Sequence, residues 1–327
     1  MRRLAAPLLI ILLSGHCALA AAPTALQVLK RTAWAAEHVS YQGRIVTIDW
    51  LEGQGTSAVA NVWHSGDRTR FAYVAPRALA GQTVVITDDI RRQYNPRTNT
   101  LTQSPALPDE GDIDVALLLR NYRVTLEPQY QTVAERHCYV LHLSPKDPSK
   151  PHRVLWVDKA SGLTLKTAQH RPRGVPTSVS YFTRVATGVS LPNSLFKLVT
   201  KRGVHVVSTL PLRRVSGSHS ATRGITAPRR LPGGYVLRGE STSLSSPSRR
   251  HFRYSDGADM LSVYISPGSS ALPTGRGITR VTIHGRPGVL VDRHQFAVLT
   301  WTSRGRTYAL VGDVTRPLLL AVANALR

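Results

Sequence analysis

The sequence predicts an α+β fold: a half-open antiparallel β-barrel with plugging helices, then a small C-terminal α/β domain of antiparallel strands with a terminal helix. Three observations lead to this. Apolar residues alternate with polar ones along most of the chain, which is the period of a β-strand. Helical spacing of apolar residues occurs in only three places. Composition changes to Ser, Gly, Pro and Arg over residues 211–230, which is typical of a linker.

The three expected helices are short and amphipathic. Thr24 and Gln27 have the spacing of a capping box, so the first helix should start there and end near His38. The second helix should start at Asp112, because an acidic residue suits the positive end of a helix. The apolar positions expected on the last helix are Leu318, Leu319, Val322 and Leu326.

The expected strands form two groups separated by the linker. The first group is 45–48, 59–63, 71–74, 84–86, 124–126, 139–143, 154–157, 163–167 and 179–185; the second is 235–237, 251–254, 261–265, 281–283, 289–291, 296–301 and 308–311. Residues 95–96 and 105–108 read as turns, and 158–162 as a hairpin loop. A long, strongly twisted meander curls, so the first two helices should fill its concave face and leave an apolar cavity.

The first twenty residues have the pattern of a secretory signal peptide. Arg2 and Arg3 precede the apolar run 8–13, and small residues at 18–20 suit cleavage near Ala20. Cys17 follows His16 where a lipid anchor needs a small residue, so cleavage is favoured over lipidation. The predicted segments are the signal peptide 1–20, a β domain 21–206, a linker 207–230 and a C-terminal domain 231–327, with the mature protein in the periplasm.

The charge of the chain is strongly positive. The formal net charge is +23, with 42 Lys and Arg against 19 Asp and Glu. After export, nucleic acid is excluded as a partner, and acidic lipid head groups, lipopolysaccharide phosphates or an acidic protein tail remain. An arginine-rich composition with a solvated surface would explain the charge equally well. A homo-oligomer stays open.

The search for catalytic and metal-binding residues finds none. Ser255 and Asp256 resemble a catalytic corner, but no G-x-S-x-G pattern surrounds them, and Asp-Gly between strands predicts a turn. Cys138 and His142 can share a strand face, yet two ligands are too few for zinc. The acidic cluster Asp109, Glu110, Asp112 and Asp114 fits a helix start better than acid–base catalysis. The chain is therefore expected to be no enzyme and to use no cofactor or metal.

The order of several short motifs resembles the MucB/RseB family of periplasmic sigma-factor regulators. In the C-terminal part these motifs are the segments 231–235 (LPGGY), 254–257 (YSDG) with 262–265 (SVYI), and 311–313 (VGD). In the N-terminal part they are 134–138 (AERHC), 156–158 (WVD) and 162–163 (GL). The resemblance implies a lipoprotein-carrier-like N-terminal domain. It also implies that the protein binds the periplasmic part of a membrane anti-sigma factor and shields it from proteolysis, with lipid or lipopolysaccharide as the releasing signal.

The candidate binding residues depend on whether the protein binds a protein partner or a lipid. If the C-terminal domain contacts the partner, Arg249, Arg250, Arg253 and Tyr254 are the candidates; otherwise the arginines are solvated charges on a strand edge. If the protein carries or senses lipid, Trp34, Trp50 and Trp63 could line the cavity; otherwise they pack in a core. An envelope hydrolase is a third and remote hypothesis, because the nucleophile motif is missing.

Overall fold

The computed structural model describes most of the chain outside its first 21 residues. The described residues are 22–51, 54–87, 90–105, 114–171, 174–208, 226–242, 249–269, 272, 278–293, 296–312 and 314–326. The predicted signal peptide, most of the predicted linker and Asp109, Glu110 and Asp112 lie outside them.

The described elements are mostly strands. The helices are α1 (Ala25–His38), α2 (Val115–Asn121), α3 (Arg316–Ala325) and the short 3-10 turns η2 (Asn193–Phe196) and η3 (Pro232–Gly234). The strands of the N-terminal part are β1 (Tyr41–Leu51), β2 (Gln54–Ser65), β3 (Arg68–Ala75), β4 (Thr83–Thr87), β5 (Ile90–Asn95), β6 (Thr100–Pro105), β7 (Tyr122–Leu126), β8 (Gln131–Val133), β9 (Arg136–Pro145), β10 (His152–Asp158), β11 (Thr164–His170), β12 (Pro176–Thr187) and β13 (His205–Ser208). Those of the C-terminal part are β14 (Arg230–Leu231), β15 (Tyr235–Thr242), β16 (Arg250–Ser255), β17 (Met260–Pro267), β18 (Ile278–Ile283), β19 (Arg286–Arg293), β20 (Phe296–Ser303) and β21 (Arg306–Gly312).

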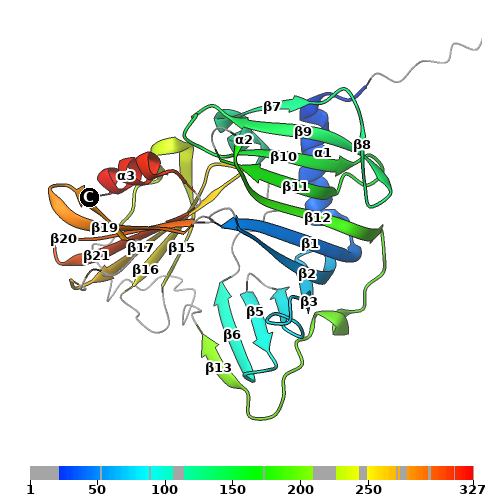
Figure 1. Cartoon of the computed structure of the whole chain (residues 1–327), viewed down its shortest axis with the longest axis horizontal. Helices are drawn as coiled ribbons and strands as arrows, with labels where there is room; N and C mark the ends of the chain where they lie inside the picture. The colour runs from blue at the N-terminus through cyan, green and yellow to red at the C-terminus, as the bar shows by residue number, and fades with distance from the viewer. Residues whose placement is uncertain are drawn as a thin grey trace, which may run out of the picture.

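The N-terminal part is built on one 13-stranded sheet, sheet A. Its order is β13-β6-β5-β4-β3-β2-β1-β12-β11-β10-β9-β7, with β8 paired to β9. Every pair is antiparallel except β13 with β6. Between its ends β13 and β7 the described residues make no pairing, so sheet A is an open curved sheet and not a closed barrel (Figure 1).

Helices α1 and α2 cover one face of sheet A. In Figure 1, α1 crosses behind β9 to β12. Leu29 of α1 and Leu118 of α2 are buried against Leu141 and Leu155 of β9 and β10. The capping box is present at Thr24 and Gln27, and α1 ends at His38, so both of these predictions are confirmed. Helix α2 begins at Val115, three residues later than predicted, because Asp114 is its N-cap and accepts a hydrogen bond from the Leu117 amide.

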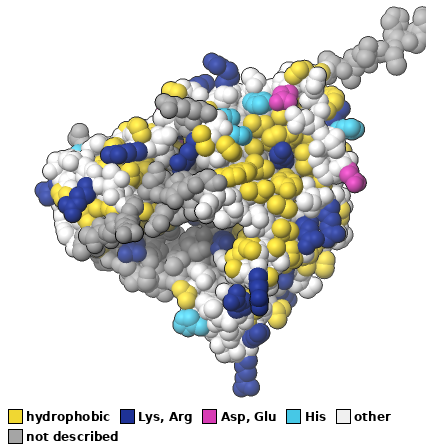
Figure 2. Space-filling view, viewed as in Figure 1, with side chains coloured by type: hydrophobic (Ala, Val, Ile, Leu, Met, Phe, Trp, Pro, Cys, Tyr) yellow, Lys and Arg dark blue, Asp and Glu magenta, His cyan; other side chains and the backbone are white. Residues whose placement is uncertain are grey.

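The C-terminal part is built on the eight-stranded antiparallel sheet B. Its order is β14-β15-β16-β17-β21-β20-β19-β18. Helix α3 packs on one face, with Leu319 and Val322 buried beside Trp301 and Phe252. The predicted turn after Ser255 is confirmed, since β16 and β17 form a hairpin around it. Figure 2 shows many Lys and Arg and few Asp and Glu side chains on the face of the molecule it presents.

Strand prediction failed where a strand carries few apolar residues. β5 (IRRQYN) has no alternation of apolar residues, and β6 begins and ends with polar residues or proline, so both segments escaped detection. β8, β13 and β14 have only two to four residues each and were also missed. These segments become strands because a paired neighbour offers backbone hydrogen bonds. Among the described residues, no helix is long and apolar enough to cross a membrane.

We predict that the C-terminal part loses stability as the pH falls from about 6.5 towards 4. His251 is stacked on Tyr264, with 4.2 Å between ring centroids, and its Nε2 lies 3.0 Å from the Ser262 hydroxyl. Burial, and then the charge of Arg253, lowers the pKa of His251 to about 4. A neutral buried imidazole stabilises the fold above its unfolded pKa, and protonation at lower pH removes up to about 3 kcal/mol.

Urea unfolding at a series of pH values measures this dependence. His251→Gln should flatten the loss between pH 6.5 and 4, whereas His38→Gln at the exposed end of α1 should leave it in place. An unchanged slope in His251→Gln would contradict the assignment.

Candidate functional site

The two sheets meet at a buried cluster of four ionised side chains and one neutral tyrosine that we call the junction: Lys150, Arg153, Asp256, Asp259 and Tyr122. Lys150, Arg153 and Tyr122 come from the N-terminal part, and the two carboxylates belong to the turn between β16 and β17. Asp256, Asp259 and Lys150 are at most 4% exposed. Lys150 pairs with Asp256, and Arg153 pairs with Asp259. The formal charges of the four ions cancel, which is the condition for burying them.

A tyrosine connects the two ion pairs. The Tyr122 hydroxyl lies 2.9 Å from Asp256 Oδ2 and 3.0 Å from Asp259 Oδ2, so its single proton is shared between two acceptors. Burial, then Asp259 and Asp256, raises the pKa of Tyr122. Burial also raises the pKa of the Asp259 carboxyl, against the opposing charge of Arg153. The tyrosine therefore acts as a neutral donor, and Asp259 depends on Arg153 to stay ionised.

Hydrogen bonds within the turn 256–259 hold the Asp256 carboxylate in position to pair with Lys150. Asp256 Oδ1 accepts hydrogen bonds from the amides of Ala258 (2.9 Å) and Asp259 (2.7 Å). Asn121 at the end of α2 donates to the backbone carbonyl of Asp256 at 2.7 Å and to that of Gly234 at 3.2 Å. The carboxylate of Asp256 thus shapes its own turn with one oxygen and binds Lys150 with the other.

Two glycines of the C-terminal part allow its segments to lie close to α2. Gly257 has φ +100°, and a Cβ there would lie 2.4 Å from the Leu118 amide nitrogen. Gly234 has φ +78°, and a Cβ there would lie 2.0 Å from Asn121 Oδ1. Lys150 also donates to the Gly233 carbonyl and lies 4.3 Å from the centre of the Tyr235 ring. Segments 231–235 and 254–257, two of the motifs noted in the sequence, therefore meet at the junction.

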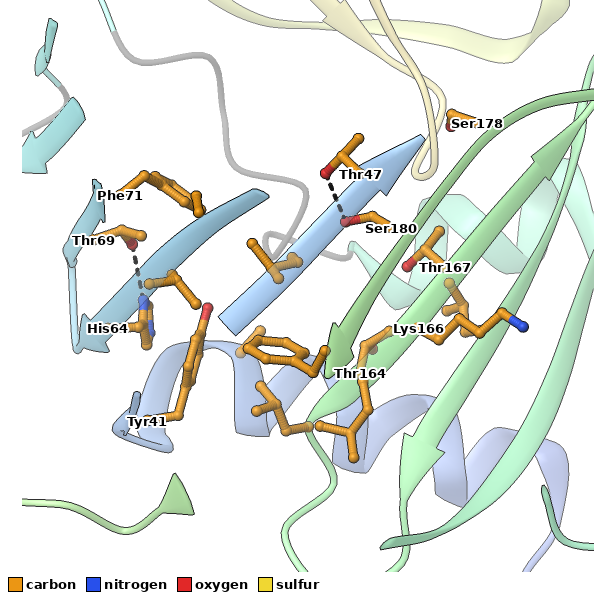
Figure 3. A pocket seen from close by; sticks show the side chains of 18 of the residues that line it. Tyr41, Thr47, His64, Thr69, Phe71, Thr164, Lys166, Thr167, Ser178 and Ser180 are labelled. Carbon is orange, nitrogen blue, oxygen red and sulfur yellow. Dashed lines mark hydrogen bonds between the residues drawn. The ribbon is translucent and has the colours of Figure 1, made fainter. Parts of the chain in front are cut away.

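A cavity of about 440 Å³ lies next to the junction, between α1 and the concave face of sheet A (Figure 3). Its wall changes character along the strands. Ile45 pairs with Phe182 across β1 and β12, and Tyr41, Val62 and Phe71 add to this apolar end. His64 is also at this end: it is 7% exposed, and its Nδ1 lies 2.9 Å from the Thr69 hydroxyl. Burial lowers the pKa of His64, which favours the neutral ring.

The opposite end of the cavity is polar. One row across four neighbouring strands reads Asp49, Ser178, Gln169 and Arg153, each paired with the next. The adjacent row contains Thr47, Ser180 and Thr167, with 3.2 Å between the Thr47 and Ser180 hydroxyls. Figure 3 shows Thr47, Ser180 and Thr167 facing the same space. The cavity expected from the sequence is therefore present, but it is amphipathic, with one apolar end and one polar end.

None of the three predicted tryptophans lines this cavity. Asp49 and His64 face it, so their neighbours Trp50 and Trp63 point to the other side of the sheet. Trp34 lies on α1, is 56% exposed and stacks on His38 at 4.8 Å between ring centroids. Helical and strand periodicity could have shown that these residues avoid the face that carries Leu29 and Ile45.

The four predicted partner-binding residues differ in accessibility. Tyr254 is fully buried, and its hydroxyl donates to the Pro228 carbonyl at 2.7 Å, so this prediction is wrong. Arg250 pairs with Glu240, and Arg253 is half-buried against Gly239. Arg249 is exposed and donates to the Ser266 hydroxyl at 3.0 Å. Strand β16 lies inside sheet B between β15 and β17, so the strand-edge explanation of these arginines is also wrong.

The predicted metal and acid–base candidates are placed in structural roles. Cys138 is buried, and burial raises the pKa of its thiol to about 11. His142 Nε2 lies 2.6 Å from a Glu127 carboxylate oxygen. Asp114 caps α2 and pairs with Arg238 of β15, which adds a further link between the two parts. In the described ranges, no three His, Cys, Asp or Glu residues gather in a group that could hold a metal ion.

We predict that Gly257→Ala destabilises the protein by about 1–3 kcal/mol more than Gly268→Ala does. Both glycines have positive φ, so alanine costs about 1–2 kcal/mol of backbone strain in each variant. Only at Gly257 would the new Cβ meet the backbone of α2, while at Gly268 nothing lies within 4 Å. Urea unfolding of the two variants measures the difference, and equal losses would show that the turn does not press on α2.

Comparison with known proteins agrees with this architecture. The model of the MucB/RseB N-terminal domain matches residues 24–199, more than half of the chain. The complex structure of Pseudomonas aeruginosa MucA/MucB is similar with a TM-score of 0.62 and 21% identity, covering 93% of this chain and 98% of that one. MucB in complex with MucA(peri) gives 0.61 and 21% with the same coverage, and MucB alone gives 0.61 and 20%, covering 93% and 97%. No curated protein matches the sequence. The family model establishes that this chain belongs to the MucB/RseB family.

Proposed function

We propose that this protein is a periplasmic negative regulator of an envelope-stress sigma factor. In this role it binds the periplasmic part of a membrane anti-sigma factor and shields that part from proteolysis. The observation that carries the proposal is the likeness to MucB solved in complex with MucA(peri), which spans 93% of this chain and so includes both sheets. Membership of the MucB/RseB family supports the same role.

The charge of the chain favours an acidic segment as the bound partner. A net charge of +23 attracts such a segment over a distance of about 10 Å at 0.1 M salt. Arg250 and Arg253 are already engaged within sheet B, so Arg249 is the member of the predicted arginine group that is best placed to reach a partner. The protein acts by holding its partner and not by turning over a substrate.

We assign the mature protein to the periplasm, after cleavage near Ala20. The proposed division is a β domain over 21–206, a linker over 207–230 and a C-terminal domain over 231–327. Strand β13 extends two residues beyond the first boundary, and β14 starts one residue before the last. These strand bounds support the proposed division.

A second function, carriage or sensing of lipid, is favoured by the cavity beside α1. Its volume of about 440 Å³ and its apolar end suit a short acyl chain. Lipid or lipopolysaccharide would then be the signal that releases the anti-sigma factor. Native mass spectrometry of the purified mature chain, incubated with short-chain phospholipid, should show a one-to-one adduct. A spectrum of bare protein at all lipid concentrations would remove this second function.

We predict that the mature chain binds the periplasmic segment of an anti-sigma factor from the same genome in a salt-sensitive way. Raising NaCl from 50 to 500 mM should weaken binding about tenfold, because salt screens the basic surface. Arg249→Gln should weaken binding about threefold, as expected for one exposed charge. Isothermal titration calorimetry measures both, and the control is Arg304→Gln at the exposed turn between β20 and β21.

Protection from cleavage is measured in the same system. Adding the mature chain should slow cleavage of the anti-sigma segment by the initiating protease in proportion to the bound fraction. No binding at 50 mM salt, or binding without any slowing of cleavage, would overturn the proposed function.

A further inference from the structure

Arg153 belongs to both sites described above. Its side chain contributes to the polar end of the cavity wall, and its guanidinium pairs with Asp259 of the C-terminal part. Arg153 stands at the end of the row Asp49, Ser178, Gln169 and Arg153, so it is the point where the cavity reaches the junction. A ligand in the cavity that binds this guanidinium therefore also changes the ion pair between Arg153 and Asp259 in the junction.

The Arg153 end of the polar row suits an anionic group, whereas the carboxylate Asp49 lies at the opposite end of the row, three strands away. Thr47, Ser180, Thr167 and Ser178 supply hydroxyls, and Arg153 supplies a fork of N–H donors that matches a carboxylate or a phosphate. The apolar end begins at Ile45 and Phe182, the pair that follows Thr47 and Ser180 on the same face of β1 and β12. An amphiphile with a short apolar chain and an anionic head can therefore occupy both ends at once.

We propose that Arg153 couples ligand binding in the cavity to the junction. An anionic head group in the cavity competes with Asp259 for the Arg153 guanidinium, and this competition weakens the contact between the turn 256–259 and the N-terminal part. The inference rests on the second proposed function, ligand binding in the cavity, and adds the coupling of that cavity to the junction; it needs no anti-sigma partner. It uses only the cavity, the Arg153–Asp259 pair and the buried turn.

If the anion removes Arg153 from the ion pair, the junction is weakened strongly, because the buried Asp259 carboxylate then loses the cation that it is paired with. Asp259 is 4% exposed and shares Tyr122 with the second carboxylate, Asp256. Without its cation, Asp259 is a buried charge beside another negative charge, and it either takes up a proton or moves towards water. Both outcomes weaken the contact between the turn and α2, while Lys150 still holds Asp256.

Thermodynamic reciprocity supplies the test. If the anion and Asp259 compete for Arg153, then removing the charge of Asp259 must tighten anion binding by the same factor by which the anion weakens the pair. Asp259→Asn keeps the size of the side chain and a hydrogen-bond acceptor for Tyr122. We expect Asp259→Asn to bind octyl phosphate about tenfold more tightly than the parent chain.

The titrations use the mature full chain and three probes: octyl phosphate, octyl glucoside and inorganic phosphate. The two octyl compounds are kept below their critical micelle concentrations. Octyl glucoside, which has a neutral head, should change its affinity less than twofold in Asp259→Asn. Inorganic phosphate separates a free anion from a lipid head group: a gain for both phosphates assigns the coupling to any anion, and a gain for octyl phosphate alone assigns it to an amphiphile.

Two arginine variants complete the design. Arg153→Gln should remove the preference for octyl phosphate over octyl glucoside. Arg136→Gln is the matched control, because Arg136 also pairs with a buried aspartate, Asp158, at 2.7 Å but is not part of the cavity lining. It should leave the affinity for octyl phosphate unchanged.

A second readout follows the junction directly. Spin labels on Glu37→Cys and Arg304→Cys, both exposed, report the distance between the two parts, and Cys138 is too buried to react. Octyl phosphate should broaden the distance distribution of the parent chain and leave that of Arg153→Gln unchanged. Equal affinity for octyl phosphate in the parent chain and Asp259→Asn, or an equal gain for octyl glucoside, would overturn the coupling.

Discussion

The structure depends on one buried constraint: two carboxylates of a C-terminal turn must find two cations on the N-terminal part. Lys150 and Asp256 are almost completely withdrawn from water. A buried charge without its partner is strongly unfavourable, so removing one member of such a pair destabilises a protein by about 3–5 kcal/mol. Apolar contacts alone would allow the two sheets to slide past each other. Ion pairs at fixed positions allow one arrangement, so they set how sheet A and sheet B meet.

The same constraint explains why two short motifs matter. Segments 231–235 and 254–257 are separated in the chain by residues 236–253, yet both contact Asn121 or Lys150. Their glycines accept positive φ: Gly257 leaves room for the backbone of α2, and Gly234 leaves room for the Asn121 side chain. These motifs therefore serve recognition within the molecule. A residue pattern that looks reactive can be a docking element when the partner surface belongs to the same chain.

The cavity and the junction are neighbours because of strand register. Residues on the concave face of sheet A change from apolar to polar along β1, β11 and β12, and β10 places Arg153 at the polar edge. Arg153 both lines the cavity and pairs with Asp259 of the C-terminal part. A ligand at the polar end of the cavity would therefore act on the contact between the two sheets through one side chain, without movement through the whole core.

The sequence by itself determined the elements that depend on local periodicity and capping: α1, α3, the hairpin at 158–162, the turn after Ser255 and most strands. It did not determine β5, β6 or β13, whose residues pair only because a neighbouring strand is present. Likewise, Lys150, Arg153 and Tyr122 carried no signal, since nothing in the chain near them shows that two carboxylates more than a hundred residues away will be buried beside them. Tertiary structure alone decided the junction, because the free energy of burying a charge depends on which opposite charge the fold brings within contact.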